Sequence, residues 1–481
     1  MNITDGLSRQ AALRPWAIAV LGTAGVVHYG ALDRMAARAS GWLRRRGVVP
    51  GQVVGLTFHE PLNHLVAALA LARCGAVQVA LAPGDPVAMR RRVADLAGVS
   101  AVAGDGEGGA LADWPFLRPE SGWLDADAPA EPALRHEDGA SPWLVSQSSG
   151  TTGTPKLFHL SHDDTAARER RESGASLVRA DDVFFSPVAL DFSAAKLHML
   201  TCLNHGGALV LERHGSLHEI AARLDACRVS YIYAPPTWAA AMLQICAGDK
   251  PRFPRLRVLR LGAGASDEAL RQAVLRGLSP NLFASYGTND AGGIAVADPA
   301  AVASCPGTIG TILEGLRWEV VDGEDRPLPA GTPGRLRLSG PGVVTGYLDP
   351  QLDARHLKDG WFYPGDMVSA DAAGRLTFHG RVDDMMNFDG IKIFPAEIEQ
   401  VLLAHPAVAE AAAFPLRVMT SRDVPMAAVV LRRPVDGEEL VGFCRERLGV
   451  RSPRRVFVLD ALPRNAVGKV LRRELSARLR A

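Results

Sequence analysis

The chain has 481 residues, enough for about two to four domains with large buried cores, so size does not exclude an enzyme. Lysine and arginine number 53 against 52 aspartates and glutamates, and a formal charge of +1 gives no overall field to attract nucleic acid or an anionic membrane. The N-terminus lacks a signal-peptide pattern, and no apolar run is long enough to span a bilayer. We therefore expect a cytoplasmic protein that binds small ligands, with no nucleic acid and no membrane among its partners.

The first part of the chain alternates helix-like and strand-like stretches, which is typical of βα units and a parallel sheet. Residues 32–46 and 63–74 have helical spacing, and residues 52–57 and 76–82 form short apolar runs. The segment 104–139 is rich in Gly, Ala, Asp and Pro, and indicates a surface excursion. Cysteines and histidines form no CxxC or HExxH pattern, so we expect neither a zinc ribbon nor a disulfide framework.

The alternation resumes after this segment and then changes character. Strand-like runs at 208–211, 231–233, 258–261 and 281–284 predict a doubly wound α/β sheet. Beyond Thr308, short alternating strands at 317–321, 334–339 and 375–379 predict a β-rich subdomain. The fold class we expect is α/β, with a large domain over residues 1–382 and a small, mobile α+β domain over residues 383–481.

The densest chemical signal is the run SSGTTGTPK, which consists of Ser148, Ser149, Gly150, Thr151, Thr152, Gly153, Thr154, Pro155 and Lys156. Glycines let backbone N–H groups converge on a phosphate, hydroxyls add donors, and Lys156 adds a mobile positive charge. The run is not a Walker A loop, because no glycine precedes Lys156 and neither serine nor threonine follows it. The alternative is a flexible linker. An apolar run before it and a helix-like stretch after it favour a phosphate loop.

This run resembles the signature of the adenylate-forming superfamily, which includes acyl-CoA synthetases, peptide-synthetase adenylation domains and firefly-type luciferases. Further motifs follow in the family's order, and the resemblance covers nearly the whole chain. They are LARCGAVQVALAPGDP at 71–86, SYGTND at 285–290, GRLRLSGPGVVTGYL at 334–348, WFYPGD at 361–366, GRVDDMMNFDGIKIFPAEIE at 380–399 and PRNAVGKVLR at 463–472. The resemblance implies that ATP and Mg²⁺ are used to adenylate a carboxylic acid.

The resemblance also implies a role for each motif. Tyr286 would lie on the adenine face, Asp290 would bind Mg²⁺, and Asp366 and Arg381 would contact the ribose. The other nucleotide-binding residues by resemblance, besides the loop itself, are Ser285, Gly287 and Gly264. Asp290 stands where the family usually has glutamate.

Two lysines are the catalytic residues that the resemblance implies. Lys156 would bind the phosphates, and Lys469 would reach both the substrate carboxylate and the α-phosphate. Asp383 falls at the family's hinge, where the small domain would rotate between the two half-reactions. Lys469 would then be in place for adenylation only.

The segment Ala189–Ser193 bears on the identity of the substrate acid, because it resembles the FDxS motif of domains that activate amino acids. Asp191 would pair with a substrate ammonium, because a buried carboxylate is costly without a cation. The alternative is that Asp191 or Ser193 caps the following helix. The other pocket residues that the resemblance implies have small or apolar side chains: Phe192, Ala195, Gly262, Phe283 and Ser285.

The chain ends soon after Lys469, so we expect a free-standing enzyme. Our preferred hypothesis is that it loads an α- or β-amino acid onto the phosphopantetheine thiol of a separate acyl or peptidyl carrier protein. Coenzyme A as the acceptor and an aryl or aliphatic acid as the substrate form the alternative. A nucleotide-binding module without catalysis is disfavoured because Lys156, Asp366, Arg381 and Lys469 are all present.

Overall fold

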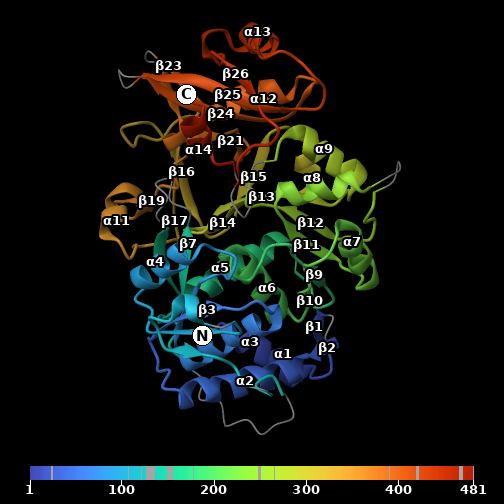
Figure 1. The fold of residues 1–481 in the computed structure, drawn as a ribbon, viewed down its shortest axis with the longest axis vertical. Coiled ribbons are helices and arrows are strands. Elements are labelled where there is room, and N and C mark those ends of the chain that lie inside the picture. The colour runs from blue at the N-terminus through green and yellow to red at the C-terminus, as the bar shows by residue number, and fades with distance from the viewer. Residues whose placement is uncertain are drawn as a thin grey trace.

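The structure is a computed structural model. The described residues are 1–22, 25–106, 108–120, 122–125, 136–148, 155–176, 178–246, 251–264, 266–388, 391–418, 422–464 and 470–479. The chain builds a large body from its first four-fifths, and the C-terminal residues gather at one end of it (Figure 1). No helix in the described ranges is long and apolar enough to cross a membrane.

The first sheet is six-stranded and mostly parallel, as the alternation of apolar runs and helical stretches predicts. Its central strands are buried on both faces, which explains their continuous apolar sequences. In spatial order the strands are β6 (Phe116–Leu117), β5 (Ala101–Gly104), β3 (Val53–Thr57), β4 (Val77–Ala80), β7 (Pro142–Ser148) and β8 (Lys156–Ser161), the last antiparallel to β7. The helices of this part are α1 (Asp5–Leu13), α2 (Tyr29–Arg45), α3 (Pro61–Cys74) and α4 (Val87–Ala97).

The second sheet begins as a parallel, doubly wound arrangement. Its parallel strands in order are β10 (Ala208–Val210), β9 (Val183–Phe185), β11 (Tyr231–Ala234), β12 (Val258–Leu261) and β13 (Leu282–Thr288). The hairpin of β1 (Ile18–Gly22) and β2 (Gly25–His28) extends the β10 edge. The associated helices are α5 (His162–Ser176), α6 (Ser193–His205), α7 (Leu217–Ala226), α8 (Pro236–Gln244) and α9 (Glu268–Gly277).

The β-rich region continues this second sheet instead of forming a separate one. From β13 the sheet runs on through antiparallel strands, so that fifteen strands form one sheet in the described part of the chain. The strands that follow β13 in this sheet are β14 (Gly292–Ala297), β15 (Thr308–Ile312), β16 (Arg317–Val321), β17 (Gly334–Ser339), β18 (Leu357–Lys358), β19 (Trp361–Phe362), β20 (Asp366–Ala370) and β21 (Arg375–Arg381). Helices α10 (Pro299–Ser304) and α11 (Pro350–His356) lie on the connections. This continuity brings motifs from the α/β half and the β-rich half to one sheet.

The C-terminal residues form an α+β unit with two hydrophobic clusters made only of residues from Met386 onward. Figure 1 shows this unit at the end of the molecule opposite α1 and α2. Its elements are β22 (Met386–Phe388), β23 (Ile391–Ile393), α12 (Pro395–Leu403), β24 (Val408–Val418), β25 (Arg422–Leu431), α13 (Gly437–Leu448), β26 (Val456–Val458) and α14 (Arg472–Arg478). The α/β fold class with a smaller C-terminal unit is confirmed, whereas the boundary at Asp383 stays a prediction.

Candidate active site

The expected phosphate loop joins β7 to β8, which pair antiparallel with Ser148 opposite Lys156. We expected a helix directly after the loop, and this was wrong, because β8 intervenes before α5 begins at His162. The antiparallel pairing of β7 with β8 brings Lys156 back beside the end of β7. Ser149, Gly150, Thr151, Thr152 and Gly153 lie outside the described residues.

Lys156 lies in a partly buried polar cluster at the start of β8. Its Nζ is 3.3 Å from Nε2 of His356 and 3.9 Å from Oδ1 of Asp290. Burial lowers the pKa of Lys156, and the Asp290 carboxylate opposes that shift. Burial and the neighbouring Lys156 cation also lower the pKa of His356, so a neutral His356 can accept a hydrogen bond from Lys156.

Asp290 is buried, with 4 % of its surface exposed, and follows the end of β13. The Tyr347 hydroxyl donates to Oδ1 of Asp290 at 2.5 Å, and Ser148 Oγ lies 3.5 Å from the same oxygen. The described residues contain no group of three or more His, Cys, Asp or Glu side chains that could hold a metal. One carboxylate nevertheless fits Mg²⁺, because this ion usually takes one or two protein carboxylates and completes its shell with phosphate oxygens and water.

The backbone around Asp290 is fixed by a buried arginine on α5. Arg168 donates to the carbonyl oxygens of Asn289 at 2.9 Å, Asp290 at 2.8 Å and Gly342 at 2.7 Å. Arg171, one turn further along α5, donates to the carbonyl of Ala291 at 2.6 Å. The helix that follows β8 therefore holds the loop that carries Asp290.

Asp366 and Arg381 are opposed on the antiparallel strands β20 and β21. Arg381 Nη1 lies 2.9 Å from Oδ1 of Asp366, and the Tyr286 hydroxyl donates to the other carboxylate oxygen. Burial, together with the Asp366 carboxylate, raises the pKa of Tyr286 well above its ordinary value, so the phenol stays protonated. Three residues from separate motifs thus meet at the C-terminal end of β13, the edge where open α/β sheets bind ligands.

The expected glycines lie at this same edge. Gly262 and Gly264 follow β12, and Ala263 between them adopts φ 61°, a left-handed conformation that is uncommon for a residue with a side chain. A Cβ on Gly287 would lie 2.5 Å from the carbonyl oxygen of Gly292, so only glycine fits there. Ser285 Oγ donates to the carbonyl of Leu261 at 3.0 Å.

Asp191 already has cations from this chain near it. Burial raises the pKa of the Asp191 carboxyl, and Lys196 and Arg213 oppose that shift. His64 Nδ1 lies 3.7 Å from Oδ1 of Asp191, and burial lowers the pKa of His64, so the imidazole is neutral. Lys196 Nζ donates to Gln78 at 2.7 Å. The argument that Asp191 needs a substrate ammonium is correspondingly weaker.

The capping alternative for Asp191 or Ser193 is wrong. Helix α6 begins at Ser193, its N-cap residue is Phe192, and no side chain makes a capping hydrogen bond there. Ser193 Oγ instead lies 2.9 Å from Ser146 Oγ. Ala195 is fully buried, whereas Phe192 is 37 % exposed.

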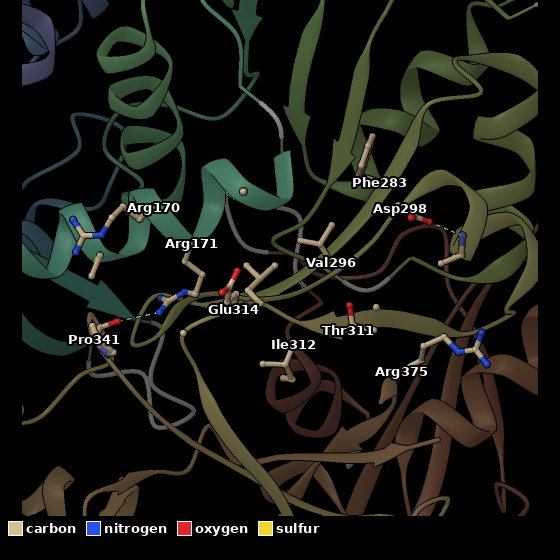
Figure 2. A pocket seen from close by; sticks show the side chains of 16 residues that line it. Arg170, Arg171, Phe283, Val296, Asp298, Thr311, Ile312, Glu314, Pro341 and Arg375 are labelled. Atoms are coloured by element: carbon tan, nitrogen blue, oxygen red, sulfur yellow. Dashed lines mark hydrogen bonds between the residues drawn. The ribbon is translucent and has the colours of Figure 1, made fainter. Parts of the chain in front are cut away.

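Phe283 lines an open pocket of about 650 Å³ to which neither Lys156 nor Asp366 contributes. Figure 2 shows Phe283 and Val296 on strands of the sheet and Arg171 on α5 pointing towards Pro341, to whose carbonyl oxygen it donates at 3.0 Å. Phe283 also packs against the hydrophobic cluster that contains Ala195. The pocket that Phe283 lines includes neither Ala195 nor Asp191.

The candidate residues in the C-terminal part of the chain are Lys469 and Asp383. Lys469 lies outside the described residues. Asp383 lies in a short 3₁₀ turn (Val382–Asp384), its side chain is half exposed, and one carboxylate oxygen is 3.7 Å from Arg381. The hinge role of Asp383 and the catalytic role of Lys469 stay predictions.

Sequence reasoning missed Tyr347, His356 and Arg168. Tyr347 lies inside the motif GRLRLSGPGVVTGYL, which could have drawn attention to it. His356 and Arg168 carry no such signal, because each reaches the site only through the folding of α11 and α5.

Comparison with known proteins identifies the family of the chain. Residues 7–348 match the family described as "AMP-binding enzyme", and residues 397–469 match the "AMP-binding enzyme C-terminal domain". The chain belongs to the AMP-binding enzyme family. The expected superfamily and the expected enzyme class, an AMP-forming acid ligase, are both confirmed.

The relatives of this chain include proteins whose names give different acyl acceptors. Feruloyl-CoA synthase of Amycolatopsis sp is 30% identical, with 98% of this chain and 97% of the relative covered. Salicyl-AMP ligase / salicyl-S-ArCP synthetase of Mycobacterium tuberculosis is 28% identical over 95% of this chain and 86% of the relative. The fold matches ATP-bound MatB from Rhodopseudomonas palustris with a TM-score of 0.90, at 23% identity and with 100% and 99% of the two chains covered.

Proposed function

We propose that this chain uses ATP and Mg²⁺ to adenylate a carboxylic acid, with release of pyrophosphate, and then transfers the acyl group to a thiol. The observation that carries the proposal is the meeting of Tyr286, Asp366 and Arg381 at the C-terminal end of β13, beside Lys156 and Asp290. Membership of the AMP-binding enzyme family supports the proposal that this cluster binds the nucleotide.

Each described group has a chemical task in this proposal. The Asp366 carboxylate accepts hydrogen bonds from the ribose hydroxyls, and Arg381 holds that carboxylate in place. Asp290 holds Mg²⁺, which neutralises charge on the phosphates when bound. Lys156 stabilises phosphate charge in a site that excludes water, where a preorganised donor is worth most.

For the acid, the names of the relatives favour an aryl or aliphatic acid over the amino acid that the FDxS resemblance suggested. Lys196 and Arg213 oppose the burial-driven rise in the pKa of Asp191 without reversing it, so cations of this chain already supply part of the charge that a substrate ammonium would bring. The two relatives described above carry the names of aryl acids, feruloyl and salicyl. Amino-acid activation remains the second candidate, supported by a relative named a probable nonribosomal peptide synthetase.

The acceptor is either coenzyme A or the phosphopantetheine arm of a carrier protein. Both present the same thiol, and the relatives named above include one of each kind. We favour coenzyme A together with the aryl or aliphatic acid, and a carrier protein together with an amino acid.

The test is acid-dependent pyrophosphate release from ATP across aryl, aliphatic, α-amino and β-amino acids, followed by thioester formation with coenzyme A or a loaded carrier protein. We expect pyrophosphate release with aryl or aliphatic acids and no release when Mg²⁺ is removed. Absence of pyrophosphate release with every acid would contradict the proposed function.

Asp191→Asn separates the two acid classes. If the aryl or aliphatic proposal holds, the order of preference among acids is unchanged in the variant. A selective loss of ~10²-fold or more for amino acids alone would instead support ammonium binding. His218→Gln, a substitution at an exposed position, is the control for effects of expression and purification of a variant.

A further inference from the structure

Three neighbouring strands carry a row of large side chains just below the turn at Gly262. The register of the second sheet pairs Tyr233 with Arg260, and Arg260 with Phe283. Because side chains alternate along a strand, Gly262 and Ser285 share the face of Arg260 and Phe283, one step nearer the C-terminal ends. A ligand over Gly262 and Ser285 therefore has Tyr233, Arg260 and Phe283 beneath it, and we call these three residues the floor.

The floor is in close contact with the residues above it. A Cβ on Gly262 would lie 2.7 Å from Ser285 Oγ, 3.0 Å from the Tyr233 ring and 3.1 Å from its hydroxyl. Gly262 must be glycine for the Tyr233 ring to lie there, and the Tyr233 hydroxyl is at the upper surface of the floor.

Arg260 is held in the floor by a buried ion pair with Glu172 of α5. Arg260 Nη1 lies 2.5 Å from Glu172 Oε2, and the two side chains are 2 % and 13 % exposed. Glu172 Oε1 lies 1.7 Å from the position that a Cβ on Gly293 would take, so the glycine makes room for this carboxylate. Burial opposes both charges, but the pair raises the pKa of Arg260 and lowers that of Glu172, so each stays charged.

His198 is an uncharged polar neighbour of the floor. The ring of His198, on α6, lies 4.2 Å from the ring of Tyr233. Burial, and then the Arg260 cation, lower the pKa of His198 to about 4, and burial raises the pKa of Tyr233 to about 12. At neutral pH, Tyr233 and His198 are therefore neutral hydrogen-bonding groups. The charge of Arg260 is balanced by the charge of Glu172.

We propose that the floor and the Arg260–Glu172 pair close the acid-binding pocket and select a short acid whose far end is polar but uncharged. This inference rests on the proposed function and specifies its substrate class. A long apolar chain would have to displace a buried ion pair, and a second carboxylate on the acid would have to compete with Glu172 for Arg260. A hydroxyl at the far end can hydrogen-bond with Tyr233 or His198.

The experiment measures kcat/KM for pyrophosphate release with 4-hydroxybenzoate, benzoate, terephthalate and octanoate. We expect 4-hydroxybenzoate to be preferred over the other three, by ~10-fold or more over benzoate. The double variant Glu172→Leu with Arg260→Met removes both charges at similar volume. It is expected to raise the ratio of octanoate to 4-hydroxybenzoate at least ~10-fold.

The matched control is another buried ion pair, Asp33→Leu with Arg73→Met, whose partners are 2.5 Å apart between α2 and α3. It is expected to leave the ratios unchanged. Tyr233→Phe removes a single hydroxyl and keeps the ring, so it decides the matter if the double variant does not fold. It is expected to abolish most of the preference for 4-hydroxybenzoate over benzoate.

Unchanged acid ratios in a folded floor variant overturn the inference while leaving the proposed function intact. A wild-type chain that releases no pyrophosphate with any acid contradicts the proposed function instead. In that case calorimetric binding of 4-hydroxybenzoate and benzoate to wild type and Tyr233→Phe decides the inference, and equal preference in the two proteins overturns it.

Discussion

The Tyr347 hydroxyl donates a 2.5 Å hydrogen bond to the carboxylate of Asp290, a residue far away in sequence. This bond fixes one carboxylate oxygen of the residue that we assign to Mg²⁺. Burial and the Asp290 carboxylate raise the pKa of Tyr347, so the phenol remains a donor at any physiological pH. Asp290 is thus oriented before the nucleotide binds.

Asp290→Asn is expected to lower acid-dependent pyrophosphate release by ~10²- to 10³-fold, because a neutral amide is a poor Mg²⁺ ligand. Tyr347→Phe keeps the carboxylate and is expected to lower the rate far less. A Mg²⁺ titration of the rate checks the assignment, and an unaltered Mg²⁺ requirement in Asp290→Asn would show that the metal binds elsewhere.

Asp366→Asn is expected to raise the KM for ATP by about 10- to 100-fold, because hydrogen bonds to a charged acceptor are worth about 1.5 to 3 kcal/mol. The sharper readout compares ATP with its 2′-deoxy and 3′-deoxy analogues. Wild type should discriminate against at least one analogue, and the variant should not. Equal discrimination in both proteins would remove Asp366 from the ribose site.

Lys469→Ala is expected to lose adenylation by ~10²- to 10³-fold while ATP still binds. Thioester formation from a chemically prepared acyl-adenylate should be nearly unaffected, since the proposed hinge motion removes Lys469 for that step. Arg478→Ala, on the exposed face of α14, is the matched control on the same domain. Equal loss in both half-reactions would argue against a domain rotation.

Acid should destabilise the fold through His162, which is fully buried and whose Nδ1 accepts a 3.2 Å hydrogen bond from the Ile3 N–H. Burial, helped by His136 and the N-terminal ammonium and opposed by Asp163 and Asp138, lowers the pKa of His162 to about 4. The unfolded chain, with a pKa of about 6.5, binds more protons between these values. Stability is therefore present above about pH 6.5 and lost as the pH falls towards 4.

The loss attributed to His162 is about 2 to 3 kcal/mol between pH 7 and pH 4.5. Urea denaturation of wild type and His162→Gln at several pH values measures it, with exposed His218→Gln as the control. The His162 variant should show a shallower pH dependence. An identical slope in wild type and His162→Gln would contradict the prediction.

Much of the α/β half could be predicted from the sequence, because its apolar runs are short, continuous and separated by helical stretches. The run predicted at 258–261 is β12 (Val258–Leu261), and that at 317–321 is β16 (Arg317–Val321). The hairpin at the phosphate loop was not predicted, because β8 is a short strand that reads as a continuation into α5.

The site was predictable where residues lie in compact motifs and not where they converge through tertiary structure. Tyr286, Asp366 and Arg381 come from three motifs, and the register of β20 with β21 places two of them opposite each other. The surroundings of Asp191 could not be predicted, because Lys196, Arg213 and His64 approach it from separate segments. A sequence shows that a carboxylate is present, but only the fold shows which cations are near it.

The three carbonyl contacts of Arg168 have a mechanical consequence. Helix α5 begins directly after β8 ends, and Arg168 of α5 donates hydrogen bonds to the turn after β13. Strand β8, helix α5 and this turn are therefore connected in series. Covalent chain and guanidinium hydrogen bonds thus connect Lys156 to Asp290. The two charged groups assigned to the phosphates and the metal are held together by elements of the large part of the chain, and no residue of the C-terminal unit takes part in this connection.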